Sequence, residues 1–410
     1  MRHMKKYFSV LLMTALITGV LAGCSSGAGG GAASSQPAAG TQEQAGSAAT
    51  QGTEVEAVDT ANIPAMNLTV SSGWGIGHCF NVYLCEPMFA ELKEMTGGNV
   101  DYTMFTDGEL IALTAELDAL RQNQADVVTS LSPFYDTARF PLSAVTGLPT
   151  TKINEVIAGN AVYALMNSDV DLDGNGGTFY KLEFQDNGVE AWPCNPTPGY
   201  YICLTKGNEI TSVADFNAGL RLRTASSAAE EYVKLLGATP VSLPGSECYD
   251  ALSRGALEGI IMPTDWVNLG YTEMLGQVID TGVGTNLSYI AVSTDTWNSW
   301  TPEMQAAFEK AYEDNYVPSF EGQTFYRERD EQELLDAGGL VTRIDELPED
   351  VQELIANATT QTWYRWIDTM EAMGEPGKAC AILWRDCLLE AGGDVPEEIK
   401  TSLEDYEPNT

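Results

Sequence analysis

The sequence of 410 residues is short of basic side chains. It has 21 lysines and arginines against 58 aspartates and glutamates, which gives a formal net charge of −37 at pH 7. A surface of that charge repels nucleic acid and anionic lipid headgroups, so we expect neither as a partner. Any site for a small anion must depend on a local cation, because the field of the whole chain opposes it.

Histidine is scarcer still, and this limits the catalytic sets that the chain can build. Of the two histidines, only His78 lies beyond the first few residues. A Ser-His-Asp or Cys-His set can therefore form only around His78, for instance with Cys79 or Cys85. The other interpretations of His78 are a polar contact to a ligand and a residue at the start of a helix. We expect no enzymatic activity and no cofactor, and an enzyme on the same scaffold stays as an alternative.

The eight cysteines include no Cys-x-x-Cys pair. Because the body of the chain has a single histidine, a zinc site has little support. Seven cysteines remain when Cys24, which is predicted below to carry a lipid, is set aside. Cys380 and Cys387 would lie roughly 10 Å apart along one helix, too far for a disulfide within it. We expect most of the seven to be buried thiols.

Only one apolar run is long, Tyr7–Val20, and it follows three basic residues and precedes Leu21-Ala22-Gly23-Cys24. This pattern predicts that residues 1–23 are a lipoprotein signal peptide, whose removal leaves Cys24 as the lipid-bearing first residue. Residues 24–60 are rich in Gly, Ala, Ser, Gln and Thr, which predicts a flexible tether. The folded body is expected outside the cytoplasm, periplasmic or at the cell surface, and attached to the membrane by lipid.

The stretch from Asp215 to Pro263 has the pattern of a β-α-β-α-β run. It predicts a strand ending at Arg223, a helix, a strand at Pro240–Leu243, a second helix and an apolar strand at Gly259–Met262. Such a run is the ordinary unit of a mainly parallel sheet. Ligands of open α/β sheets gather at the carboxyl ends of strands, so Arg223 is a candidate carboxylate-binding residue.

The first half of the chain repeats this alternation. Strands are predicted at Asn67–Ser72, Val100–Phe105 and Ala125–Ser130, each followed by a helical or turn segment. A glycine-rich turn at residues 73–78 could hold a dinucleotide, but no acidic partner follows the second strand, which favours a turn beside a ligand at a helix N-terminus.

Two α/β halves imply a cleft between them. We expect a two-domain α/β fold. Asn286–Ser293 is predicted to be a strand that returns the chain to the first domain, and Pro302 is predicted to start a long helix. The predicted domains are residues 66–199 with 285–318, and residues 200–284 with 319–400 including the C-terminal helices.

A weak calcium-loop candidate lies at Asp171, Asp173 and Asn175, where oxygen donors alternate and a glycine follows. The bidentate acid should fall at Leu182, yet Glu183 stands one place later. An acidic, glycine-rich surface insertion is therefore the preferred interpretation, and we predict no metal site.

Short segments from residue 66 to about 320 resemble the substrate-binding proteins of TRAP transporters, also known as DctP-type solute-binding family 7. The segments that carry the resemblance are Phe89-Ala90, Thr96-Gly97-Gly98, Gly108-Glu109-Leu110, Ala119-Leu120, Phe140-Pro141-Leu142, Leu148-Pro149, Gly219-Leu220-Arg221-Leu222-Arg223, Leu236-Gly237-Ala238-Thr239-Pro240-Val241 and Glu247-x-Tyr249-x-Ala251-Leu252-x-x-Gly255-x-Leu257-Glu258-Gly259. The resemblance implies a periplasmic-binding-protein-like fold, in which two α/β domains are joined by crossing strands and a long domain-spanning helix and close on a ligand in the cleft. It also places Arg223 at the position of the family's signature arginine, which pairs with a ligand carboxylate.

The chain departs from well-known members in ways that bear on the ligand. It has no second arginine in the predicted strand around Tyr200. Trp74, Tyr200, Met262 and Trp266 could offer an apolar or aromatic wall, or could be domain packing. Asp265 could meet a ligand amine or hydroxyl, or cap the next element.

The sequence therefore predicts a lipid-anchored extracytoplasmic protein that captures a small organic acid and delivers it to a TRAP permease in the membrane. The ligand is expected to be a monocarboxylate with an apolar or aromatic body, held by Arg223. A binding protein that serves an ABC-type importer or a sensor remains a second possibility.

Overall fold

The structure is a computed structural model, and it describes residues 60, 62–197, 199–243, 245–285 and 287–409. The predicted signal peptide, Cys24 and all of the predicted tether except Thr60 lie outside these residues. Within the described part, no helix combines the length and the apolar composition that a membrane crossing requires.

The first sheet has five strands in the order β2-β1-β3-β10-β4. Strands β1, β2 and β3 are parallel, and β10 runs antiparallel to both of its neighbours. The strands are β1 (Met66–Ser71), β2 (Val100–Phe105), β3 (Val127–Leu131), β4 (Val189–Pro193) and β10 (Tyr289–Ser293).

Helices cover both faces of this sheet, and the side chains of its strands alternate between them. Val127 and Ile290 pack in a cluster with α1 (Glu86–Met95) and α7 (Pro302–Tyr316). Their neighbours in sequence pack in a second cluster on the other face, which includes α3 (Glu155–Met166). The alternation is the period of two that a strand buried on both faces requires.

The second sheet has six strands in the order β11-β9-β5-β8-β6-β7. Its central part is the run predicted from the sequence: β6, α4, β7, α5 and β8 follow one another, and β7, β6 and β8 are parallel. The elements are β5 (Tyr200–Thr205), β6 (Arg221–Thr224), α4 (Ser227–Leu236), β7 (Thr239–Ser242), α5 (Gly245–Ser253), β8 (Gly259–Met262), β9 (Leu275–Val283) and β11 (Leu340–Arg343).

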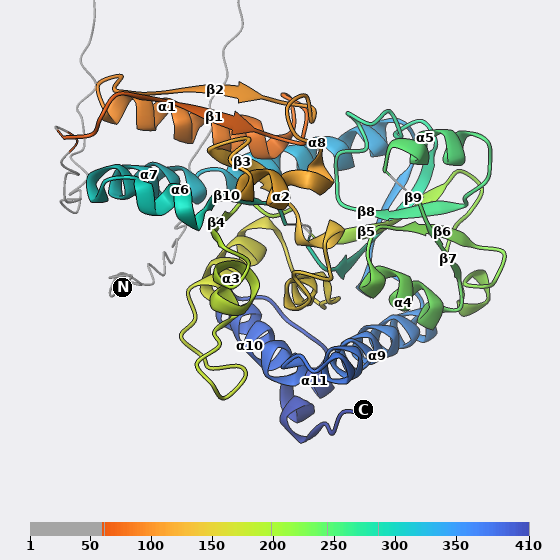
Figure 1. Ribbon diagram of the computed structural model, residues 1–410. Coiled ribbons are helices and arrows are strands. Elements are labelled where there is room, and N and C mark those ends of the chain that lie inside the picture. The colour runs from red at the N-terminus through yellow and green to blue at the C-terminus, as the bar shows by residue number, and fades with distance from the viewer. Residues whose placement is uncertain (1–59, 61, 198, 244, 286, 410) are drawn as a thin grey trace, which may run out of the picture. The chain divides into compact units, whose positions relative to one another are not determined.

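Two short segments carry the chain between the sheets. Residues 194–199 lead from β4 to β5, and residues 284–288 lead from β9 back to β10. The return of the chain through a strand near residue 290 was predicted from the sequence. The α/β fold with crossing strands is confirmed by this arrangement (Figure 1).

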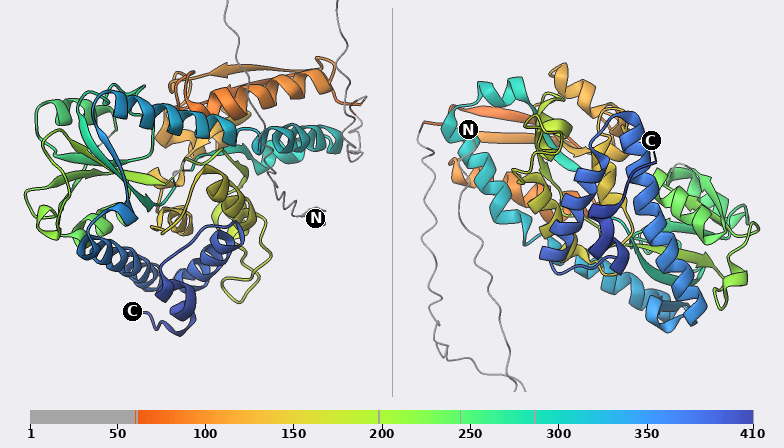
Figure 2. Two further views of the ribbon diagram at one scale, coloured as in Figure 1. Left: turned by 180° about the vertical axis from the view of Figure 1, so that it is seen from behind. Right: turned by 90° about the horizontal axis from the view of Figure 1, so that it is seen from below.

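The long helix predicted from Pro302 is present as two helices, α7 and α8 (Phe320–Asp336). They are separated by a turn at residues 317–319, because Pro318 has no N–H to donate and its ring clashes with the preceding turn. Phe320 packs with the first sheet, whereas Leu334 packs with the second, so α8 spans both (Figure 2). Gly322 lets α8 approach closely, because a Cβ there would overlap the ring of Tyr83.

Helix α9 (Glu349–Met373) also joins the two parts of the core, as Figure 1 shows. Its first half packs on α4 beside the second sheet, and its second half enters the cluster of the first sheet. Helices α10 (Gly377–Glu390) and α11 (Glu397–Ser402) share that latter cluster. Helices α10 and α11 thus pack with the first sheet and α9 packs with both, whereas the predicted second domain included all of the C-terminal helices. Periodicity showed which side of each helix is apolar, but not which sheet that side would meet.

Candidate ligand-binding site

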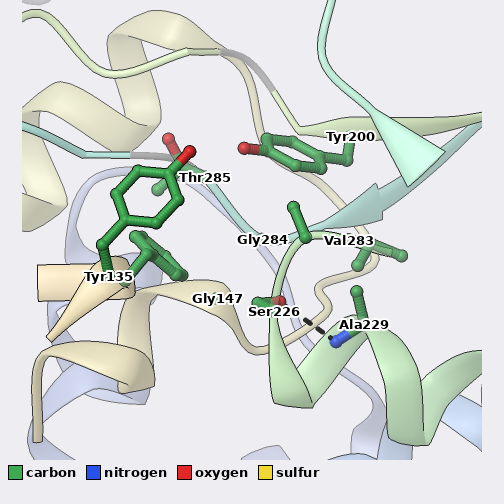
Figure 3. A pocket seen from close by; sticks show the side chains of 10 residues that line it. Tyr135, Gly147, Tyr200, Ser226, Ala229, Val283, Gly284 and Thr285 are labelled. Carbon is green, nitrogen blue, oxygen red and sulfur yellow. Dashed lines mark hydrogen bonds between the residues drawn. The ribbon is translucent and has the colours of Figure 1, made fainter. Parts of the chain in front are cut away.

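A small cavity lies where the two sheets meet, with a volume of about 30 Å³. Its walls come from both parts of the fold, as Figure 3 shows. The first sheet contributes residues that follow β3, the second contributes β5 and the start of α4, and the crossing segment after β9 completes it. The lining residues are Phe134, Tyr135, Gly147, Tyr200, Ala225, Ser226, Ala229, Val283, Gly284 and Thr285. The space holds roughly two water molecules.

Two tyrosines face each other across this cavity. Tyr135 ends a short 3-10 helix after β3, and Tyr200 begins β5. Their hydroxyl groups point toward one another in Figure 3, and Tyr135 is half exposed at 50%. Burial raises the pKa of the Tyr200 hydroxyl, and the nearby Arg223 guanidinium opposes part of that rise. Tyr200 therefore stays protonated and can donate a hydrogen bond to an anion.

The N-terminus of α4 forms another wall. Ser226 is its N-cap residue, and the side-chain oxygen of Ser226 accepts a hydrogen bond from the Ala229 amide at 3.2 Å. The amides of Ser227 and Ala228 have no partner within the helix, as is general for the first turn. Together with the helix dipole, these amides make the start of α4 suited to an anion.

Arg223 lies in β6, directly before α4. Its Nε donates to the carbonyl oxygen of Leu243 at 3.0 Å, and none of the described carboxylates lies within ion-pair distance of its guanidinium. Arg221, two residues earlier, is instead bound to Glu258, with Nε and Oε2 2.8 Å apart. Arg223 thus keeps its charge available. It is not among the residues that line the cavity, but it is close enough to influence Tyr200.

Two of the residues suggested as an apolar wall are in the core. Trp266 is fully buried, and its Nε1 donates to the carbonyl oxygen of Asp330 at 2.8 Å. Met262 is 5% exposed and lies opposite Tyr201 in the ladder between β5 and β8. Tyr200 is the one of the four suggested residues that lines the cavity.

Trp74 and His78 form a stacked pair, with ring centroids 4.7 Å apart. The Nε1 of Trp74 donates to the Ser288 hydroxyl at 3.1 Å, which ties the glycine-rich turn to the start of β10. His78 accepts a hydrogen bond on Nδ1 from the Phe80 amide at 3.3 Å. Burial lowers the pKa of His78 to about 4, so the ring is neutral near pH 7.

Cys79 lies beside His78, with its sulfur 3.8 Å from Nδ1. A Cys-His nucleophile needs a lowered thiol pKa and a base that can hold the proton. Burial instead raises the pKa of Cys79 to about 12 and lowers that of His78. The two shifts oppose the formation of a thiolate-imidazolium pair, so this contact does not supply the catalytic set that the enzyme alternative requires.

Asp265 follows β8 and has a φ of 116°, which is rare for a residue other than glycine. Its Oδ1 accepts from the Asn268 side chain at 2.6 Å and lies 4.0 Å from Arg329. Burial raises the pKa of Asp265 to about 6. In this structure its carboxylate is used to hold the loop after β8 against α8.

The acidic loop at residues 171–177 uses its carboxylates for backbone turns. Asp171 accepts from the Gly174 amide at 2.9 Å, and Asp173 accepts from the Asn175 and Gly177 amides. Glu183 instead accepts from two amides of the segment after Pro141, at 3.0 and 2.7 Å. Across the described ranges, no three His, Cys, Asp or Glu side chains are grouped to hold a metal ion.

The cysteines of the described part are free thiols, and six of the seven are buried. This agrees with the expectation from their spacing. Cys79 is the partly exposed one.

Sequence reasoning missed Tyr135 and Ser226. Tyr135 lies four residues after the end of β3 and Ser226 two residues after the end of β6. The rule that ligands gather at the carboxyl ends of strands, which selected Arg223, applies equally to both positions. Both could therefore have been found.

Comparison with known proteins gives a consistent result. A model of the family described as bacterial extracellular solute-binding protein, family 7, matches residues 81–365. The C4-dicarboxylate-binding periplasmic protein DctP of Rhodobacter capsulatus is 29% identical over 239 residues, which is 54% of this chain and 64% of that protein. The chain thus aligns with less than two thirds of the length of this curated relative.

Solved structures share the fold at low identity. One is a TRAP solute-binding protein from a marine metagenome, specific for aromatic acid ligands and in complex with metahydroxyphenylacetate. It has a TM-score of 0.68 and 18% identity, and the match covers 79% of this chain and 99% of that one. Another, from Rhodoferax ferrireducens in complex with copurified benzoate, has a TM-score of 0.65 and 17% identity over 80% and 98% of the two chains. Since the family model spans well over half of the sequence, the chain belongs to family 7 of the bacterial extracellular solute-binding proteins.

Proposed function

We propose that this protein captures a small organic acid between its two sheets and delivers it to a TRAP permease. The observation that carries the proposal is Arg223, an arginine without an ion-pair partner among the described carboxylates, next to the N-terminus of α4. The ligand carboxylate would receive hydrogen bonds from the terminal nitrogens of Arg223. The first amides of α4 and the hydroxyls of Tyr135 and Tyr200 lie close enough to the same region to assist.

Electrostatics favours an anion at this place in spite of the charge of the whole chain. The net charge of −37 repels anions at long range, but that repulsion is screened beyond about 8 Å at physiological ionic strength. At contact distance, charge-assisted hydrogen bonds from an arginine and a helix terminus dominate. The missing second arginine near Tyr200 leaves one strong cation, which suits a monocarboxylate better than a dicarboxylate.

The size of the cavity implies that the protein opens to admit its ligand. A volume of about 30 Å³ is at least tenfold below that of ordinary ligand pockets. Binding would therefore move the two sheets apart about the crossing segments, and the ligand would then be enclosed as they close. Closure removes water from the Arg223 contact and strengthens it.

The body of the ligand is proposed to be apolar or aromatic. The cavity walls combine the rings of Phe134, Tyr135 and Tyr200 with the small side chains of Ala225 and Ala229. Aromatic acids bound to proteins of the same fold support this choice, since metahydroxyphenylacetate and benzoate are the ligands of the two structures described above.

Delivery to the membrane is the remaining part of the proposal. The family match and the shared fold support a TRAP permease as the partner. Lipid attachment at Cys24 and the tether of residues 24–60 would keep the protein near that permease. Both rest on the sequence, because these residues lie outside those that the structure describes, apart from Thr60.

A thermal-shift screen of the purified protein against organic acids tests the proposal. A ligand that binds only the folded state raises its unfolding temperature. At least one monocarboxylate should produce a shift, and the shift should be lost in Arg223→Ala. If no acid stabilises the protein, or if Arg223→Ala responds as the parent does, the proposed function is refuted.

A further inference from the structure

A groove with a volume of about 580 Å³ lies between helices α4 and α9, which run side by side in Figure 1. Ordinary ligand pockets have volumes of roughly 300–1,000 Å³. The walls of the groove come from residues 227–234 of α4 and residues 362–373 of α9, and side chains between residues 137 and 144 complete it. We refer to it as the α4–α9 groove.

The groove is separate from the cavity near Arg223, although α4 contributes to both. Ser226 and Ala229 line the cavity, whereas Glu231 and Lys234 line the groove. At 3.6 residues per turn, these two pairs lie well apart around the helix. The groove is therefore a second space and not an extension of the first.

The part of the groove that α9 provides is largely apolar. Trp366, Met370 and Met373 recur at helical spacing on one face of α9, and Pro141 and Ala144 join them from the first part of the fold. Met373 is 57% exposed, although it is a large apolar side chain. Methionine is flexible and adapts its shape to a bound molecule. The groove thus offers a surface for the apolar body of a ligand.

Trp366 also has an unfilled hydrogen-bonding group. The residue is 6% exposed, and its indole N–H has no acceptor among the described residues. Buried N–H groups of folded proteins are nearly always hydrogen-bonded. Because Trp366 lines the groove, an oxygen atom of a molecule bound there would supply the missing acceptor.

The charges that line the groove leave one carboxylate in excess. Lys234 is paired with Glu230 at 2.8 Å, and Arg365 is paired with Glu231 across the two helices. The remaining carboxylate is that of Asp368, and none of the described cations lies within ion-pair distance of it. The two cations of the groove are therefore already neutralised, and Asp368 is not.

Asp368 is held in place as an anion. Its Oδ1 accepts hydrogen bonds from the Tyr406 hydroxyl and from the Asn409 amide, both at 2.8 Å. Burial by itself raises the pKa of the Asp368 carboxyl, but the hydrogen bonds from Asn409 and Tyr406 outweigh it, and the net shift is downward. A carboxylate accepts about four hydrogen bonds, so Asp368 has room for a further donor.

We propose that the α4–α9 groove binds a small organic amine, whose ammonium group pairs with Asp368 and whose apolar body carries an oxygen atom that accepts from Trp366. This inference goes beyond the proposed function and does not depend on it. The chemistry of the groove is opposite to that of Arg223, because an acid would meet an excess of carboxylates here. The net charge of −37 also favours the approach of a cation.

Three related probes test the inference by isothermal titration calorimetry at pH 7. Tyramine has the ammonium group, an aromatic body and a hydroxyl; phenethylamine lacks the hydroxyl, and tyrosol lacks the amine. The parent protein should bind tyramine with a dissociation constant below about 1 mM. Tyrosol should bind at least about tenfold more weakly, and phenethylamine about 3- to 10-fold more weakly. In Trp366→Phe, tyramine and phenethylamine should bind equally.

Two variants test the charge, and a third is the matched control. Asp368→Asn should weaken tyramine binding at least about tenfold. Thr369→Lys should do the same, because it adds a cation at an exposed position of the groove while leaving the contacts of Asp368 intact. Glu353→Gln removes one negative charge from an exposed position of α9 outside the groove, and it should leave the affinity unchanged. The unfolding temperature without ligand shows that each variant is folded, and Thr369→Lys decides if Asp368→Asn is not.

The inference is overturned if tyramine does not bind below about 1 mM, if tyrosol binds as well as tyramine, or if Thr369→Lys binds tyramine as the parent does. A preference for tyramine over phenethylamine that survives in Trp366→Phe also overturns it. Arg223→Ala should bind tyramine with the parent affinity. Loss of tyramine binding in Arg223→Ala would place the amine at the acid site and overturn the inference. A failure of all organic acids to bind would instead refute the proposed function and leave the groove as an amine site.

Discussion

Replacing Arg223 by alanine is the perturbation that the structure makes most informative. Its Nε is already bound to Leu243, which leaves the two terminal nitrogens for a carboxylate. Each hydrogen bond to a charged group contributes about 1.5–3 kcal/mol, so two contribute about 3–6 kcal/mol. Arg223→Ala should therefore weaken binding of the best acid roughly 10²- to 10⁴-fold.

The effect should appear in affinity and not in stability. The structure shows no described carboxylate paired with Arg223, so its removal leaves no buried charge uncompensated. Arg223→Lys keeps the charge but loses the planar pair of donors, and its affinity should lie between those of the parent and Arg223→Ala. Calorimetric titration at physiological ionic strength gives both dissociation constants, and circular dichroism confirms that each variant is folded.

Arg221 provides a matched control in the same strand. It is already bound to Glu258 at the surface, so Arg221→Ala should leave the affinity unchanged and change the stability of the fold little, as is usual for exposed ion pairs. A dissociation constant for Arg223→Ala within about threefold of the parent, or an equal loss in Arg221→Ala, would contradict the reasoning.

Three further predictions follow from the same structure. Tyr135→Phe and Tyr200→Phe each remove one hydroxyl at the cavity, and calorimetry should show roughly 3- to 10-fold weaker binding of the acid; unchanged affinity in both would exclude the hydroxyls from the contact. Gly322→Ala places a methyl group against the Tyr83 ring, so chemical denaturation should show a loss of about 1–3 kcal/mol, and a variant as stable as the parent would show that α8 does not need this close approach. Burial raises the pKa of the Glu116 carboxyl from 4.5 to about 8, so the folded state binds the carboxyl proton more tightly than the unfolded state does. The free energy of unfolding should therefore fall as the pH rises from 4.5 to about 8, by at most about 1.4 kcal/mol per pH unit. Glu116→Gln should therefore gain stability relative to the parent between pH 5 and pH 8, and a constant difference across that range would refute the shift.

Much of the second sheet could be predicted from local sequence. The run from β6 to β8 has alternating apolar strands and helices with clear start and stop signals, and Gly237 ends α4 in the left-handed conformation that glycine adopts at low cost. These signals depend on interactions between residues that are close in sequence. Signals of the same kind predicted that Arg223 lies near the carboxyl end of its strand, where the structure has it.

The packing of the C-terminal helices could not be predicted in this way. Trp363 and Trp384 lie among apolar residues at helical spacing, but that spacing does not specify the sheet against which they pack. Burial in one cluster or the other depends on contacts across more than two hundred residues. Only the folded chain shows that α9 joins both clusters and that α10 lies on α3.

The sequence by itself determined the class of the protein, its scarcity of positive charge and the arginine that could bind an anion in spite of the negative net charge. The tertiary structure decided which aromatic residues meet the cavity and which are core. Trp266 and Tyr200 had equal standing as wall residues in the sequence, yet Trp266 is sealed by α8 through its bond to Asp330, whereas Tyr200 faces Tyr135 across the cavity. The physical reason is that exposure is a property of all the segments that approach a side chain, and those segments come from distant parts of the chain.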